Sequence, residues 1–354
     1  MRCGFFLSLL LVWTGVWGGE VRFSKGTGPL RLAVAGLSHG HVESVMGASR
    51  RDDVTLVGVW EPDEELAARF ALREEMKGVS VFSDLEKMIE ESEPEAVSGM
   101  TSIGEHLRVV EACAPRGVHV FLEKPLDFSA ERAKRMVELG EEYGVLVLTN
   151  FETSWYASVR EVGRTVKEGG IGEVRRMVFR HGHKGPEEIG CRPEFLKWLM
   201  SEEGKGGGAS VDFGCSGAVI ATWLMDGQRP EEVTALVHHV KSGDGVVDDD
   251  ATILLRYKTA QAVIQASWAW THDCKEMDVF GTRGSLHAGK WDQLESRAPD
   301  GQRNPERVRK MAGALSDQWV YLREVVRGEC PVDALSSPEA NLVVAEILEA
   351  ALGE

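Results

Sequence analysis

The chain has 354 residues, 43% of them hydrophobic and 27% charged, which suits about two folded domains and excludes wholesale disorder. The formal net charge of -16 argues against nucleic acid and anionic membrane surfaces as partners, because an acidic chain repels phosphate groups. A neutral, polyhydroxylated small molecule is compatible with this charge.

Residues 1–19 differ in composition from the rest of the chain. Arg2 gives a positive start, residues 5–17 carry no charge, and Val16 and Gly18 are small enough for a secretory cleavage site. We expect a signal peptide over residues 1–19 and an exported protein, periplasmic or extracellular, with no membrane span after cleavage. A retained N-terminal anchor is the alternative. The remaining cysteines match no disulfide framework, so we expect free thiols.

Residues 29–150 alternate short apolar runs with helical stretches. This alternation is typical of a parallel sheet covered by helices on both faces, so we predict a Rossmann-like doubly wound domain. The predicted strands are residues 30–36, 55–60, 96–100, 119–122 and 145–149, and the predicted helices include 41–51, 105–114 and 130–143.

The pattern changes after residue 150, where longer strand-like runs follow a helix at 156–168. We predict a second, α/β domain over residues 151–335, with a large open, mostly antiparallel sheet, and a C-terminal helix within 336–354. Asp248, Asp249 and Asp250 are expected to form a solvated turn between strands, with cation binding as the alternative. The predicted strands are residues 173–180, 232–240, 251–257, 261–270 and 275–280, of which the last four are interpreted as a meander.

The first strand leads into a loop that could hold a dinucleotide. Backbone N–H groups between a strand and a helix N-terminus bind the diphosphate in Rossmann folds. The usual G-x-G-x-x-G fingerprint is only partly present, since serine and histidine replace its second and third glycines. Taken alone, the loop is a weak signal, and an ordinary strand-to-helix turn is the alternative. The candidate cofactor-binding residues are Gly36, Ser38, His39, Gly40 and His41.

Two further features strengthen the cofactor prediction. Glu61 ends the second predicted strand, where a carboxylate can bind the ribose hydroxyls and repel the 2′-phosphate of NADP. NAD is therefore favoured, although a solvated glutamate before Pro62 is the alternative. Glu123-Lys124-Pro125 ends a buried strand at the sheet edge that binds ligands, and a lysine there can hydrogen-bond a substrate hydroxyl as hydride leaves.

Several segments, taken in order, resemble the Gfo/Idh/MocA family of glucose–fructose oxidoreductase and inositol dehydrogenase-like enzymes. The segments are residues 84–86, 101–106, 117–126, 167–174 and 206–214. The resemblance implies a Rossmann domain followed by an open-sheet domain, a sugar-type substrate and a homo-oligomer. It also implies that Lys124 is catalytic, that Glu123 lies beside the nicotinamide with Thr101 and His106 near the cofactor, and that Asp212 lines the active site.

One position departs from the family pattern. Many members carry a histidine four residues after the aspartate as an acid/base, and this chain has Ser216 there. His181 and His183 lie two residues apart at the exit of a predicted strand and so share a face. We predict that His183, or else His181, replaces the missing base, with purely structural loop histidines as the alternative. No metal site is predicted, because no carboxylate completes a ligand set at motif spacing.

These features together predict an NAD-dependent oxidoreductase acting on a sugar or glycoside hydroxyl. An exported enzyme has no maintained pool of NAD, so the cofactor is expected to be held tightly and regenerated in each cycle. One alternative is a redox-neutral glycoside hydrolase that oxidises, eliminates, hydrates and reduces. The other is a non-catalytic homologue that binds a sugar or a dinucleotide.

Overall fold

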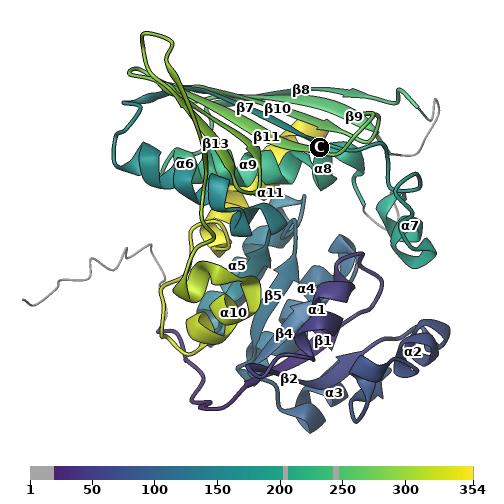
Figure 1. Cartoon of the computed structure of the whole chain (residues 1–354). Coiled ribbons are helices and arrows are strands. Elements are labelled where there is room, and N and C mark those ends of the chain that lie inside the picture. The colour runs from purple at the N-terminus through teal and green to yellow at the C-terminus, as the bar shows by residue number, and fades with distance from the viewer. Residues whose placement is uncertain (1–19, 202–205, 242–246, 354) are drawn as a thin grey trace, which may run out of the picture.

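The computed structural model of the protein describes residues 20–201, 206–241 and 247–353, arranged around two sheets (Figure 1). The expected signal peptide lies outside these residues. No helix in the described ranges is both long and apolar enough to cross a membrane. All five cysteines in these ranges are free, as expected.

The first sheet is parallel, with the strand order β3-β2-β1-β4-β5-β6. β1 lies at the centre because its apolar residues are buried on both faces, and Leu32 pairs with Leu56 on one side and Ala96 on the other. The strand order reverses between β1 and β4, which is where such sheets open a ligand crevice. The strands are β1 (Leu30–Ala35), β2 (Val54–Trp60), β3 (Ser80–Phe82), β4 (Ala96–Gly99), β5 (His119–Glu123) and β6 (Val147–Asn150).

Helices cover both faces of this sheet, as the alternating pattern predicted. Their inward residues are spaced three or four apart, for example Leu66 and Phe70 on one helix. The helices are α1 (Val42–Ala48), α2 (Glu64–Ala71), α3 (Leu85–Ser92), α4 (His106–Cys113) and α5 (Ala130–Tyr143).

The second sheet has the order β14-β13-β12-β11-β7-β10-β9-β8 and is mostly antiparallel. Its inner face is covered by α6 (Ala157–Lys167), α8 (Gly208–Asp212), α9 (Gly214–Leu224) and α11 (Pro338–Leu352), and its outer face is open (Figure 1). The strands are β7 (Val174–Gly182), β8 (Glu232–His238), β9 (Asp250–Arg256), β10 (Gln261–Ser267), β11 (Cys274–Gly281), β12 (Ser285–Lys290), β13 (Gln293–Arg297) and β14 (Arg303–Arg307).

The predicted four-strand meander is wrong at one step. β10 and β11 follow each other in the chain, yet β7 lies between them, parallel to β10 and antiparallel to β11. Met177 and Phe179 of β7 are fully buried, as suits a central strand. The short connection between β10 and β11 suggested a hairpin. In the structure this connection passes over the end of β7, so the two strands lie on either side of β7.

Two helices connect regions that the sequence order had separated. α10 (Gln318–Val326) returns to the first sheet and packs Trp319, Leu322 and Val325 into its core. α11 packs against both α9 and α5, so it joins the two sheet systems. Residues 151–335 were predicted as one domain by chain order, which did not anticipate this return of α10.

Two helical glycines provide a test of the packing. A Cβ at Gly163 on α6 would overlap the ring of Trp223, whereas a Cβ at Gly47 on α1 would meet nothing within 4 Å. We expect Gly163→Ala to destabilise the protein by about 1–3 kcal/mol through overpacking. Gly47→Ala should be neutral or stabilise by about 0.5–1 kcal/mol. Urea unfolding midpoints measure both, and equal midpoints would contradict the packing described.

Candidate active site

The site lies where the carboxyl edge of the first sheet meets the inner face of the second. Lys124 follows β5, and Asp212 ends α8. The Lys124 ammonium forms an ion pair with the Asp212 carboxylate and donates to its main-chain oxygen at 2.8 Å. Their side chains are only 14% and 12% exposed, so water screens the pair weakly. The two domains thus each supply one partner of a buried ion pair.

Asp212 is held by contacts with two other segments. Trp268 donates its indole N–H to the second carboxylate oxygen at 2.9 Å. The start of α8 is fixed by Asp248, which accepts from the Ser210 N–H at 2.8 Å and its hydroxyl at 2.7 Å. The expected solvated turn is therefore wrong here: Asp248 and Asp249 are 5% exposed and satisfy backbone N–H groups that burial would otherwise leave without acceptors.

Mutual attraction sets the protonation of this pair. Burial alone would lower the pKa of Lys124 and raise that of Asp212. The opposite charge outweighs burial in both, so the pKa of Lys124 lies well above its usual range and that of Asp212 falls to about 2. At neutral pH the lysine is an ammonium that donates hydrogen bonds and has no free lone pair to accept a proton.

The structure brings His183 close to this pair and keeps His181 in the core. His181 is 2% exposed on the inner face of β7, and burial lowers its pKa to about 3. His183 is half-buried, stacks edge-on against Phe213 at 4.9 Å between ring centroids, and has a pKa lowered by burial. Its Nδ1 accepts from the Gly185 N–H at 3.0 Å, so the neutral ring carries its proton on Nε2.

The loop after β1 is shaped for close approach of a ligand to its backbone. Gly36 has φ of 81°, and a Cβ there would lie 2.6 Å from the Thr101 methyl group, so only glycine fits. The N–H groups of Leu37 and Asp63 donate to the two oxygens of Glu61 at 2.8 and 2.9 Å. Burial raises the pKa of Glu61. Glu61 is therefore hydrogen-bonded to the predicted cofactor loop through the Leu37 N–H.

Other groups of the loop remain available to a ligand. The His39 N–H donates to the Met100 oxygen, but across the described residues the N–H groups of Ser38 and Gly40 have no partner. His106 is buried, donates Nδ1–H to the Leu126 oxygen at 3.0 Å, and leaves its Nε2 acceptor without a partner in the described ranges. A dinucleotide could use these groups: the free N–H donors for its diphosphate, the Glu61 carboxylate for its ribose hydroxyls, and His106 Nε2 as a further acceptor.

Glu123 anchors a charged pair at the base of this site. Its carboxylate meets His41 Nδ1 at 2.8 Å and accepts from the Asn150 amide at 2.8 Å. Burial opposes its charge, yet His41 lowers the pKa of Glu123 to about 2. The pKa of His41 is raised in return, although burial acts against this. The two side chains thus favour each other's charged form, and the His41 side chain is 40% exposed.

His39, His41 and Glu123 also place one potential metal ligand each within 4.8 Å of one another. Their hydrogen bonds favour another use. His39 Nδ1 accepts from the His41 N–H at 3.0 Å, so its neutral ring holds a proton on Nε2, and burial keeps its pKa well below the usual range. His41 Nδ1 is committed to Glu123. The cluster is therefore better described as hydrogen-bonded than as a metal centre.

A second polar group lies in the site and was not predicted from the sequence. Glu152, just after β6, accepts from the Tyr156 hydroxyl at 2.6 Å and forms an ion pair with Lys275 of β11. A signal was present, since Glu152 lies just after a buried strand, as Glu61 does, and Glu123 ends one. The charges of Lys275, Glu152 and Lys124 all act on His181, which places this group beside the inner face of β7.

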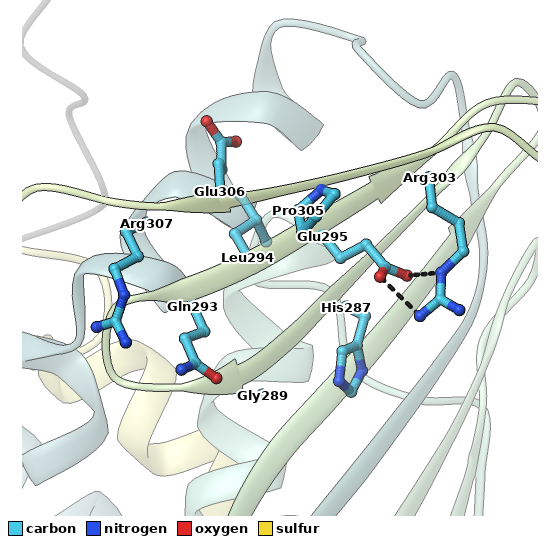
Figure 2. Close-up of a pocket in the computed structure, with 9 residues that line it drawn as sticks. All are labelled: His287, Gly289, Gln293, Leu294, Glu295, Arg303, Pro305, Glu306 and Arg307. Atoms are coloured by element: carbon cyan, nitrogen blue, oxygen red, sulfur yellow. Dashed lines mark hydrogen bonds and ion pairs between the residues drawn. The ribbon is translucent and has the colours of Figure 1, made fainter.

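A separate hollow of about 460 Å³ lies on the outer face of the second sheet (Figure 2). It is lined by polar side chains of β12 to β14, including His287, Glu295 and Arg303, and Glu295 and Arg303 pair across it. Its residues alternate with the buried Leu286 and Ala288, so it lies on the opposite face of the sheet from His181.

Two family models match the chain. One, described as an oxidoreductase family with an NAD-binding Rossmann fold, matches residues 30–151, and the other, the GFO/IDH/MocA C-terminal domain, matches residues 159–287. The chain is 28% identical to 1,5-anhydro-D-fructose reductase of Ensifer adhaerens, over 69% of this chain and 71% of the reductase. It is 27% identical to myo-inositol 2-dehydrogenase of Thermotoga maritima, over 73% and 75%.

Other similarities are more partial or concern the fold alone. The match to trans-1,2-dihydrobenzene-1,2-diol dehydrogenase of Xenopus tropicalis is 24% identical and covers 51% of each chain, about half the length of that relative. An inositol dehydrogenase homologue from Azotobacter vinelandii, solved with NAD+, superposes with a TM-score of 0.78 at 19% identity, covering 95% of this chain and 96% of that one. An aldose–aldose oxidoreductase from Caulobacter crescentus, solved with glycerol, superposes with a TM-score of 0.74 at 19% identity. The match covers 91% of this chain and 96% of that one.

The buried ion pair predicts a non-additive response to mutation. Lys124→Met leaves the Asp212 charge buried without a partner, which should destabilise the protein by about 3–5 kcal/mol. Lys124→Met with Asp212→Asn removes both charges and keeps an acceptor for Trp268, so most of the loss should be recovered. Denaturant unfolding at neutral pH measures this double-mutant cycle. A double variant no more stable than Lys124→Met would refute the coupling.

His41 and Glu123 predict a pH-dependent contribution to stability. The folded pKa of His41 is raised, so the pair stabilises the fold fully below the unfolded value of about 6.5 and loses this contribution as pH rises through the folded pKa. His41→Gln should therefore lower the free energy of unfolding more at about pH 6 than at about pH 9. Denaturant unfolding at both pH values tests the sign, and an equal loss at the two would contradict it.

Proposed function

Because the chain belongs to the GFO/IDH/MocA oxidoreductase family and carries an NAD-binding Rossmann fold, we propose that it oxidises a hydroxyl group of a sugar or glycoside. The observation that carries the proposal is the buried Lys124–Asp212 ion pair at the ligand-binding edge of the first sheet. Relatives named for acting on inositol and anhydrofructose support the substrate class.

Lys124 is proposed to bind the reacting oxygen. Its ammonium is permanently charged, held in place by Asp212, and able to donate to the substrate hydroxyl and stabilise the negative charge that grows on it. Bound NAD would accept the hydride from the carbon that carries this hydroxyl. Asp212 orients the lysine and keeps it protonated, while Trp268 keeps Asp212 in position.

The role of His183 follows from its hydrogen bond. With Nδ1 occupied by Gly185, the neutral ring offers an Nε2–H donor, and it can take a proton only by giving up that bond. We propose that His183 is the group that stands in for the missing histidine at Ser216. When the bond from Gly185 is given up, the neutral ring can carry its proton on Nδ1, and the Nε2 lone pair then accepts the proton of the substrate hydroxyl as hydride leaves the carbon. His181 is too weak a base for this work, because its pKa is about 3.

The paired charges of the site favour a neutral substrate. Lys124, Lys275 and His41 each already face a carboxylate, from Asp212, Glu152 and Glu123. Binding a carboxylate or phosphate on the substrate would require breaking one of these pairs. Sugar hydroxyls can instead donate to the carboxylates and accept from the cations, which these pairs allow.

Export and a retained cofactor complete the proposal. The apolar residues 1–19 support a signal peptide, and outside the cytoplasm a retained NAD must be regenerated on the enzyme. A relative in fold named aldose–aldose oxidoreductase is consistent with coupling one sugar oxidation to another reduction. A homo-oligomer is also proposed, since Leu254 and Phe280 are exposed on the open outer face of the second sheet.

Cofactor retention is directly measurable. Protein purified without added cofactor and then denatured should release near-stoichiometric NAD(H), detected by mass spectrometry. On a panel of sugars and glycosides, turnover should be abolished by Lys124→Ala. Aglycone release without net NADH would assign a redox-neutral glycoside hydrolase, and no turnover with either protein would assign a non-catalytic homologue.

His183 is tested by a pair of substitutions. His183→Ala should lower kcat by about 100-fold or more if the ring handles the proton. His183→Gln keeps a donor but no base, so it should match the alanine variant in kcat and bind substrate more tightly. Unchanged turnover in His183→Ala would remove His183 from the mechanism. A glutamine variant with full activity would leave it a donor only.

A further inference from the structure

A segment of the second domain crosses to the loop after β1. We call residues 191–199, which contain α7 (Pro193–Leu199), the strap. Arg192 donates to the main-chain oxygen of His39 at 3.0 Å, and the rings of Phe195 and Trp198 lie 5.1 and 5.7 Å from the His39 ring. In Figure 1, α7 hangs from the second sheet toward α1 and α2.

The strap lies against the loop in which a dinucleotide diphosphate would bind. Arg192 contacts the His39 oxygen, and the Phe195 ring contacts the Cβ position of Gly40. Besides burial, the Asp212 charge raises the pKa of Cys191 and the Glu194 charge raises the pKa of Glu61, in keeping with this position.

Contacts of modest strength hold the strap to the first domain. Arg192 pairs with Glu43 of α1 at 3.2 Å and lies 5.2 Å over the Phe70 ring of α2. Glu194 pairs with Arg69 of α2. The Glu43, Arg69 and Arg192 side chains are partly exposed, and such pairs are individually weak. The strap is thus positioned across the domain boundary but is not locked there.

Two groups where the strap meets the loop after β1 lack partners among the described residues. Trp198 is only 8% exposed, and its buried indole N–H has no partner among the residues that the structure describes. The Gly40 N–H is likewise free in these ranges, and the Phe195 ring lies 3.6 Å from the position of a Cβ on Gly40. A buried donor without an acceptor is costly, which points to a ligand at this place.

We propose that the strap closes over the bound dinucleotide and that Arg192 supplies the positive charge beside its diphosphate. This rests on the proposed function, because it assumes that NAD binds along the loop. Phe195 and Trp198 then form an apolar wall above the cofactor, and Arg192 can exchange Glu43 for the diphosphate, a stronger and bidentate partner. The cofactor leaves only when the strap lifts, which gives retention a structural cause.

The test measures how fast the cofactor leaves. Full-length protein loaded with NADH is mixed with excess NAD+, and the loss of bound-NADH fluorescence gives the dissociation rate. Phe195→Ala and Arg192→Gln should each raise this rate by about tenfold or more. Arg229→Gln, which removes an arginine paired with Glu346 on α11, is the matched control and should leave the rate unchanged. Thermal unfolding confirms that each variant is folded.

Hydrogen exchange provides a second readout that does not depend on fluorescence. Adding NAD+ to the wild type should slow exchange over residues 191–199, and less so in Arg192→Gln. If all variants bind NADH and release it at the wild-type rate, the strap proposal is overturned and the proposed function stands. Tighter NADH binding by the strap variants would also overturn it, by showing that the strap competes for the site. A wild type that binds no NADH would overturn the proposed function itself.

Discussion

The buried ion pair between Lys124 and Asp212 is the interaction on which the rest of the structure depends. Its two partners come from different sheet systems, so the pair exists only when those systems are docked. α11 maintains this docking, because it packs against α5 of the first sheet system and α9 of the second. The site therefore depends on how the two domains are arranged, and a shift between them would directly alter the contact between Lys124 and Asp212.

Paired charge is the common feature of the site. Glu123, Glu152 and Asp212 each neutralise a cation, and each also accepts a second hydrogen bond, from Asn150, Tyr156 and Trp268. Because every carboxylate has at least two donors, the side chains are fixed before any ligand arrives. Such preorganisation lowers the reorganisation needed when charge develops on a substrate oxygen.

Much of the fold was predictable because buried parallel strands are marked by continuous apolar runs. β1, β5 and α11 were found at or near their observed bounds, and Lys124 and Glu61 were placed at the correct sheet edge. The insertion of β7 between β10 and β11 was not predictable, since strand order is a long-range property. The donor form of His183 depends on a single Gly185 N–H, and the strap on packing between domains, neither of which leaves a local sequence pattern.

The return of α10 to the first sheet has a consequence for how the chain folds. Trp319, Leu322 and Val325 complete a core whose other members precede residue 150, apart from neighbours on the same helix. A chain growing from its N-terminus therefore displays an incomplete apolar surface until almost nine-tenths of it has been synthesised, and a fragment cut after β6 would keep that surface exposed. The nucleotide-binding half is thus not an autonomous module, and chaperone engagement during synthesis should persist until its last helix emerges.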